Sequence, residues 1–186
     1  MLSKFKSLKI KAKLLINTII LLSLMVVVAI VGYVSFTQLN TAMDKLEDAS
    51  ADVYEFANLK AHMNVERAAL VTMMSETDRT KQEAQHAIIK ESTNDTNKML
   101  EAMDKKGQPQ KFKELKKTWE EFRDVRDQRL IPLIYKGEFQ DAKALALGEQ
   151  AARFKKIFTL LNELIDEHGK EKEALKANAE NIFEKS

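Results

Sequence analysis

The chain has 186 residues, of which 30 are Lys or Arg and 28 are Asp or Glu, so its formal net charge is only +2. Cysteine is absent, which excludes disulfide bonds, thiol catalysis and covalent attachment of a c-type haem. All 28 acidic residues but only 25 of the basic ones lie beyond residue 36, so this larger part carries about −3 and offers no footprint for a nucleic acid.

The N-terminal part is dominated by an apolar run from Leu14 to Phe36 that contains no charged side chain. A run of about 20 apolar residues is long enough to cross the hydrocarbon core of a bilayer as a single helix. We therefore expect residues 14–36 to form a transmembrane helix.

Charges on the two sides of this run indicate its orientation. Five lysines and no acidic residue precede it, whereas Asp44, Glu47, Asp48 and Asp52 are among the charges that follow. The positive-inside rule predicts a cytoplasmic N-terminus, residues 1–13, and export of the rest across the membrane. A cleaved signal peptide is disfavoured because its apolar region is shorter and ends in a small-x-small site, which residues 32–36 do not offer.

Residues 37–186 are predicted to form one all-α domain. Glycine and proline number only five and two in the chain, and no alternating β pattern occurs. Breaks near Thr77, Gly107 and Gly137 separate four expected helices at 39–75, 79–105, 109–136 and 138–184. Short connections make neighbouring helices antiparallel, which predicts an up-down-up-down four-helix bundle whose first helix continues the transmembrane helix.

The first and last helices are longer than the middle two, so the last is expected to return to the membrane. A second transmembrane helix is expected after residue 186. Steps of three and four residues mark the packing stripes. The first helix places Lys60 and Arg67 on its stripe and the last helix places His168 and Lys172 there. The second has Ile88, Ser92, Met99 and Met103; the third has Phe112, Leu115, Trp119, Phe122, Arg126, Arg129 and Leu133, with Val125, Leu130 and Ile134 as an alternative.

Cations at apolar stripe positions are the main candidates for a binding site. Arg67, Arg126 and Arg129 are all expected roughly 12–17 Å from the membrane-distal end of the bundle, at 1.5 Å per helical residue. Together they could bind an anion such as a carboxylate, which matches the planar guanidinium. The structural alternative is that Glu66, Asp127 and Glu149 neutralise them, or that their stems pack along the surface.

Nothing in the sequence indicates catalysis, a cofactor or a metal site. Glu83 and His86 form one Glu-x-x-His pair, but a di-iron bundle needs a second copy and further glutamates. Phosphate-binding glycine loops and nucleophile elbows are absent as well.

The order of the motifs LKIKAKLLINTIILLSL, GYVSFTQLNTAMDKL and YKGEFQDAKAL resembles that of bacterial methyl-accepting chemotaxis proteins with a periplasmic four-helix-bundle sensor. The resemblance covers essentially the whole chain. It implies a homodimer in the inner membrane that binds ligand near the membrane-distal part of the bundle and signals down the last helix to cytoplasmic signalling proteins. In the amino-acid receptors of this class, arginines of the first helix contact the ligand, and Arg67 matches them by helix and height.

Two functions therefore compete. The first is a chemotaxis sensor that binds a small anionic ligand such as a carboxylate and relays the signal by a small displacement of the last helix. The polar layer of His168 and Lys172 is the place where that helix is expected to yield. The second is a membrane-anchored helical protein that binds another protein. The ligand, and whether the output is chemotaxis, a kinase or a cyclase, cannot be deduced from the sequence.

Overall fold

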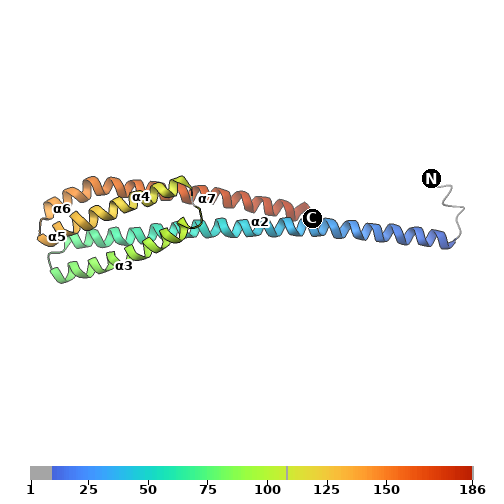
Figure 1. Cartoon of the computed structure of the whole chain (residues 1–186), viewed down its shortest axis with the longest axis horizontal. Helices are drawn as coiled ribbons and strands as arrows, with labels where there is room; N and C mark the ends of the chain where they lie inside the picture. Colours follow the sequence, from blue (N-terminus) through green and yellow to red (C-terminus); the bar gives the residue numbers. More distant parts are fainter. Residues whose placement is uncertain (1–9, 108, 186) are drawn as a thin grey trace. The chain divides into compact units, whose positions relative to one another are not determined.

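The computed structural model describes residues 10–107 and 109–185, and every element in these ranges is helical (Figure 1). In chain order the elements are α2 (Ile10–Ser75), α3 (Arg79–Asp104), α4 (Gln110–Val125), the π-helix η1 (Arg126–Leu130), α5 (Ile131–Lys136), α6 (Phe139–Leu145), the π-helix η2 (Ala146–Gln150) and α7 (Ala151–Lys185). The all-α prediction and the four expected helices are confirmed, since α4–η1–α5 and α6–η2–α7 each form one continuous helical rod.

The chain divides into two compact units. One comprises residues 49–171, which form a four-helix bundle from the second half of α2, α3, the rod α4–η1–α5, and α6–η2 with most of α7. The other comprises residues 1–48 and 172–186, of which α2 and the end of α7 are described. Residues 1–9, with most of the expected cytoplasmic lysines, lie outside the described residues.

The bundle reverses direction where the sequence supplies specific capping residues. Asp78 caps α3 by accepting backbone N–H bonds from Thr80 and Lys81, which satisfies donors left open at a helix start. Gly107 and Gly137 both have φ near 77°, the left-handed region that glycine enters without strain. Gly137 ends α5 in this conformation.

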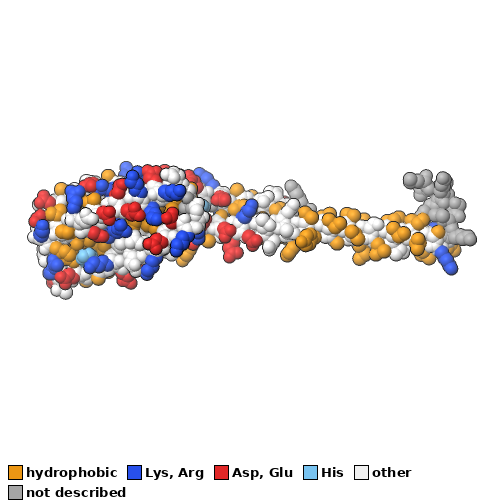
Figure 2. All heavy atoms as spheres, viewed as in Figure 1, with side chains coloured by type: hydrophobic (Ala, Val, Ile, Leu, Met, Phe, Trp, Pro, Cys, Tyr) orange, Lys and Arg blue, Asp and Glu red, His pale blue; other side chains and the backbone are white. Residues whose placement is uncertain are grey.

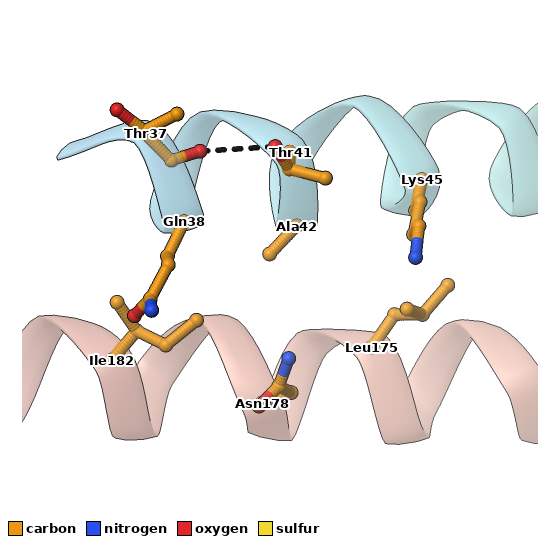
Figure 3. A pocket seen from close by; sticks show the side chains of 8 residues that line it. All are labelled: Thr37, Gln38, Thr41, Ala42, Lys45, Leu175, Asn178 and Ile182. Carbon is orange, nitrogen blue, oxygen red and sulfur yellow. Dashed lines mark hydrogen bonds between the residues drawn. The ribbon is translucent and has the colours of Figure 1, made fainter. Parts of the chain in front are cut away.

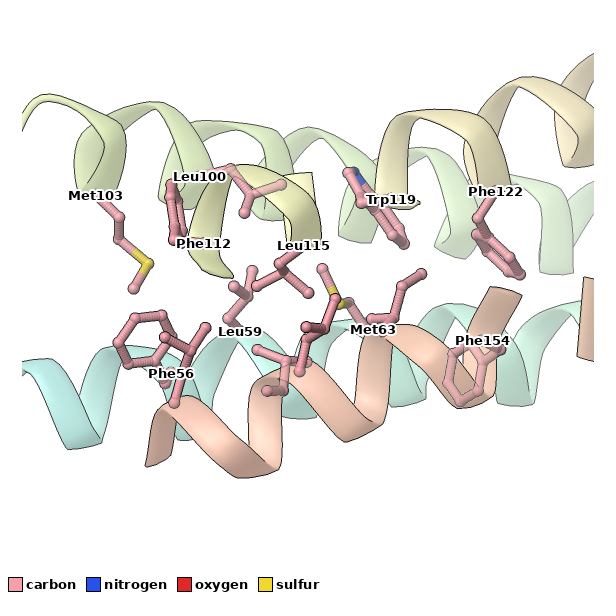
Figure 4. Packing of buried hydrophobic residues seen from close by; sticks show 14 residues of the cluster. Phe56, Leu59, Met63, Leu100, Met103, Phe112, Leu115, Trp119, Phe122 and Phe154 are labelled. Carbon is pink, nitrogen blue, oxygen red and sulfur yellow. The ribbon is translucent and has the colours of Figure 1, made fainter. Parts of the chain in front are cut away.

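The bundle core has two clusters of buried apolar side chains. One joins α2, α3, α4 and α7 and includes Phe56, Met63, Leu115 and Trp119 (Figure 4). The other lies toward the loops that join α2 to α3 and α5 to α6, and contains Leu70, Met73, Ile89, Leu130 and Ile134. Because every helix contributes to at least one cluster, apolar burial drives the packing.

Two π-helices shift the packing stripes that the sequence predicts. A π-turn adds one residue to the helical repeat. Beyond Arg126, the buried positions are Leu130, Ile131 and Ile134, and Arg129 is exposed. The alternative packing stripe of the third helix, which contained Leu130 and Ile134, is therefore confirmed for the last part of this rod. In the fourth rod, η2 likewise leaves Leu147 69% exposed and buries Gln150.

The stripe predicted for the second helix is partly wrong. Ile88 is exposed, and Ile89 occupies the buried position in its place. Ser92 and Met103 are buried as expected, and Thr96 and Leu100 complete the face. The error arose because polar Thr96 was not recognised as a core residue.

The other unit contains the apolar part of α2. Apart from the partly buried Ile16, its large hydrophobic side chains from Leu14 to Phe36 are exposed, and orange atoms dominate this part of the space-filling view (Figure 2). Among the described residues, one helix is long and apolar enough to span a membrane, and this is α2. Its N-terminal half therefore fits a transmembrane helix.

Candidate ligand-binding site

Arg126 lies in the bundle core and is fully paired. Its side chain is 2% exposed and donates to the carboxylate of Glu66 on α2, which is itself 1% exposed. Its Nε and Nη2 atoms also donate to Asp127, at 2.7 and 3.1 Å. A guanidinium with two carboxylate partners and almost no accessible surface is not positioned to meet a ligand from solvent.

Arg129 and Arg67 are both exposed, but their partners differ. Arg129 donates to Glu149 over 3.1 Å, with its side chain 57% exposed. The guanidinium of Arg67 lies 4.8 Å from the ring centroid of Phe154 on α7, a cation–π contact. The structure therefore separates the three predicted arginines: one is buried, one belongs to a surface ion pair and one lies on an aromatic ring.

Arg67 differs from every other arginine in the chain. The remaining five, Arg79, Arg123, Arg126, Arg129 and Arg153, each form an ion pair with a carboxylate. Within residues 10–107 and 109–185, no carboxylate is ion-paired with Arg67. Its charge is thus available to an external anion.

Two hollows meet at the Arg67–Phe154 contact. The first, of about 100 Å³, is mainly apolar and lies between α2, α4, η2 and α7. The second, of about 360 Å³, is more polar and lies between α2 and α7. Arg67 and Phe154 line both hollows, so a ligand could place an apolar group in one and a charged group in the other.

Gln150, one of the residues that line the apolar hollow, has an unsatisfied polar atom. The side chain of Gln150 is buried, and its Nε2 donates to the backbone carbonyl of Phe122 over 2.9 Å. This bond fixes the amide orientation, and Oε1 of Gln150 is buried without a hydrogen-bond partner among the described residues. A buried acceptor without a donor costs free energy.

The polar hollow is cationic. It is lined by Arg67 and Lys155 and by no acidic residue, and its polar walls include Thr159 and Asn162. Lys60 reaches the same edge, where its Nζ donates to Oδ1 of Asn162 over 2.7 Å. The sequence indicated Lys60 and Arg67 through their stripe positions. It gave no sign of Lys155 or Gln150, because η2 changes which residues of the last rod face α2.

The exposed face of α2 in the bundle is almost free of charge. From Ala49 to Ser75, Arg67 is the only exposed charged residue. The other exposed residues are small or uncharged, at steps of mostly three or four: Ala51, Tyr54, Ala57, Ala61, Asn64, Val65, Ala68, Val71, Thr72 and Ser75. In a chain with 31% charged residues, such a face is typical of a contact surface rather than of a solvated one.

The predicted relay residues lie where the two units divide, between Glu171 and Lys172 on α7. His168 packs against Phe56, with ring centroids 5.3 Å apart. Its buried Nδ1 lies 3.6 Å from Asp52 and 3.8 Å from Glu171 and forms no hydrogen bond among the described residues. Lys172 is half-buried. Both side chains are thus partly buried on α7, and their role in signal relay stays a prediction.

A further hollow of about 440 Å³ lies in the membrane-proximal unit, between α2 and the end of α7 (Figure 3). Gln38 and Lys45 of α2 and Asn178 of α7 point into it. These three side chains are exposed. This hollow therefore lacks the buried polar group that distinguishes the Arg67 hollows.

The fold is a bundle of four long helices joined to an apolar helix that fits a membrane span, which is the architecture of a membrane-anchored helical module. The family comparison agrees: residues 7–183 match the model of the four-helix-bundle sensory module for signal transduction, which occurs in chemoreceptors. The chain belongs to this family. No curated protein and no solved structure matches it.

Proposed function

We propose that the chain is the extracytoplasmic sensor module of a transmembrane chemoreceptor, with a cytoplasmic N-terminus, and that it binds a small organic anion at Arg67. The observation that carries this proposal is that Arg67 alone among the arginines has no carboxylate partner in the described residues, while it lines two adjoining hollows. Arg67, Lys155 and Lys60 supply the charge, and the chain is not assigned an enzymatic activity.

The hollows also indicate the shape of the ligand. A carboxylate would bind Arg67 and Lys155 at the polar hollow, where no acidic residue competes. A hydrogen-bond donor would reach Oε1 of Gln150, and a small apolar group would pack between Leu70 and Phe122. A small amino or hydroxy acid with an apolar side chain has these three features.

Homodimerisation is supported by the uncharged face of α2. A second copy could pack its own α2 against this face in a two-fold symmetric contact. The chain has no natural cysteine, so single-cysteine variants test the contact cleanly. We expect Ala61→Cys to form disulfide-linked dimers in membranes, and Ala152→Cys, which is exposed on α7, to remain monomeric under the same oxidation.

Signal relay follows from ligand binding between α2 and α7. A ligand that favours one offset of these packed helices shifts the population toward it, and movements of about 1–2 Å are typical. The polar layer at His168 and Lys172 is the place proposed for α7 to yield toward cytoplasmic signalling partners. Replacing both residues by leucine is expected to lock the output of the full receptor; a normal response to ligand would contradict this role.

The competing function is a membrane-anchored protein whose uncharged α2 face binds a different protein. A thermal-shift screen of the full chain in lipid nanodiscs separates the two, with fluorescence of Trp119, which is buried beside Phe122, as the readout. A ligand at 100 times its Kd should stabilise the fold by about 2.7 kcal/mol. A panel of amino acids, organic acids, amines and inorganic anions that produces no shift in a folded chain would favour the protein-binding function.

A further inference from the structure

A buried carboxyl group that the proposed ligand site does not use lies in the middle of the bundle. Glu66 of α2 is 1% exposed and contacts three groups from two other helical rods. It accepts hydrogen bonds from Arg126 of η1, from Thr93 over 3.0 Å and from Thr96 over 3.1 Å, the last two on α3. A single carboxyl group thus connects α2, α3 and the π-helix.

The surrounding hydrogen bonds suit both protonation states of this carboxyl group. Thr93 Oγ1 lies within bonding distance of two acceptors, Glu66 Oε2 at 3.0 Å and the carbonyl oxygen of Ile89 at 2.7 Å. A hydroxyl group has one proton to donate. When Thr93 donates to Ile89, its own oxygen is free to accept the proton of a neutral Glu66.

Arg126 also keeps a counter-ion in either state. Its guanidinium is bonded to both oxygens of Asp127, at 2.7 and 3.1 Å. Protonation of Glu66 would therefore weaken the link between α2 and η1 without leaving a buried cation unpaired. The π-helix is a suitable element for such a change, because π-turns inside α-helices commonly occur at functional sites.

We infer that Glu66 is a proton-binding site through which external pH regulates the attachment of η1 to α2 in the sensory bundle. The regulation acts inside the core and does not require a ligand at Arg67. Acidification would loosen the contact between α2 and the rod α4–η1–α5, and this changes the packing that a signalling bundle transmits.

The electrostatic environment supports a transition near neutral pH. Burial raises the pKa of Glu66 from its ordinary value of 4.5 to about 7, although Arg126, Thr93 and Thr96 each lower it. The charged group that acts on Glu66 is Arg126 on η1, which also pairs with Asp127, while His62 and Arg67 are its neighbours along the sequence of α2. On α3, His86 is farther along the helix and feels both Arg126 and Asp127; α7 contributes no ion pair to Glu66 in the described residues.

Infrared spectroscopy tests the protonation directly. Burial raises the pKa of Glu66 to about 7, so a carboxylic C=O band should appear between pH 8 and pH 6 in the full chain in nanodiscs, and comparison with Glu66→Gln assigns it. Histidines that titrate in this range give no such band. We expect the band in the unmodified chain and in the control Glu91→Gln, an exposed carboxyl group on α3, and its loss in Glu66→Gln. Absence of the band, or its persistence in Glu66→Gln, would overturn the inference.

A second variant keeps the test independent of how well Glu66→Gln folds. Thr96→Val removes a hydroxyl that stabilises the charged form of Glu66, so the midpoint of the band should move to higher pH; an unchanged midpoint would contradict the assignment.

Hydrogen exchange measures the structural consequence of protonation. After correction for intrinsic rates, amides of residues 126–130 should exchange faster at pH 6 than at pH 8. Equal protection at both pH values would show that protonation does not reach η1, and would refute the regulatory part.

Discussion

The buried pair of Arg126 and Glu66 yields a quantitative prediction for the variant Arg126→Met. Methionine replaces most of the aliphatic stem but leaves a carboxylate that is 1% exposed without its counter-ion. Removing one partner of a buried ion pair typically destabilises a protein by about 3–5 kcal/mol. We expect a loss of this size in the free energy of unfolding at pH 8, where Glu66 is mostly ionised.

The same reasoning fixes how the loss depends on pH. Without Arg126 the pKa of Glu66 rises further, since the cation is the largest influence that lowers it. Protonation of Glu66 in the variant removes the buried unpaired charge, and the free energy of unfolding recovers by about 1.4 kcal/mol per pH unit as the pH falls. The loss should therefore shrink between pH 8 and pH 7, and the double variant Glu66→Gln/Arg126→Met should recover part of it at pH 8.

The assay is denaturant unfolding of the full chain in nanodiscs, followed by Trp119 fluorescence. Arg129→Met is the matched control, because its partner is Glu149 in an ion pair whose side chains are 57% and 39% exposed. Exposed pairs contribute about 0–1 kcal/mol, so the control should differ little from the unmodified chain. A loss below about 1 kcal/mol in Arg126→Met at pH 8, or an equal loss in Arg129→Met, would refute the reasoning.

Three further predictions concern stability. Burial raises the folded-state pKa of Glu66 to about 7, so the folded chain binds more protons than the unfolded chain between pH 4.5 and 7. The Tm should therefore fall as pH rises through this window, and it should fall less in Glu66→Gln. A Tm that rises equally in both chains would contradict this prediction. Asp78→Ala removes two bonds to the first turn of α3 and should cost about 1 kcal/mol in denaturant unfolding, against no change if the cap is unimportant. Gly137→Ala places a side chain at a residue with φ 77° and should lower the free energy of unfolding by about 1–2 kcal/mol. Gly148→Ala, with no atom within 4 Å of the added carbon, should be neutral or stabilising. Equal effects of the two substitutions would rule out backbone strain at Gly137.

The helical architecture was predictable because its signals are local. Few glycines and prolines, a capping residue at Asp78 and glycines at 107 and 137 place the breaks to within one or two residues of those observed. The apolar run of α2 was equally clear, since a membrane span depends on composition rather than on packing. The boundaries at 13 and 36, the cytoplasmic N-terminus and a second span after 186 remain predictions.

The ligand site could be predicted only in part, because the π-helices interrupt the heptad pattern. The sequence placed Arg126 and Arg129 on the stripe of the third helix, at the height of Arg67 on the first, but η1 exposes Arg129 and the core pairs Arg126 with Glu66. A regular repeat cannot reveal such a one-residue shift. The sequence did not predict Lys155 and Gln150 as site residues for the same reason, because η2 determines which residues of the last rod point toward α2.

Residue Thr96 illustrates a second limit. Its hydroxyl is 0% exposed and donates to Glu66, so a polar residue occupies a core position that hydrophobic patterning assigns to the surface. Buried polar groups are tolerated where each has a partner, and the partner here lies 30 residues away on α2. Only the tertiary structure shows such a pairing.

The most direct test of the sensor assignment is the affinity of a ligand from the screen for the full chain carrying Arg67→Ala or Arg79→Ala. Both arginines lie over aromatic rings, but Arg79 contacts Tyr135 at 3.6 Å and is already paired with Glu83. A charge-assisted bond to the ligand contributes about 1.5–3 kcal/mol, so Arg67→Ala should raise Kd by roughly 10- to 150-fold while Arg79→Ala leaves it unchanged. Equal affinities for all three chains would show that the ligand does not bind at Arg67.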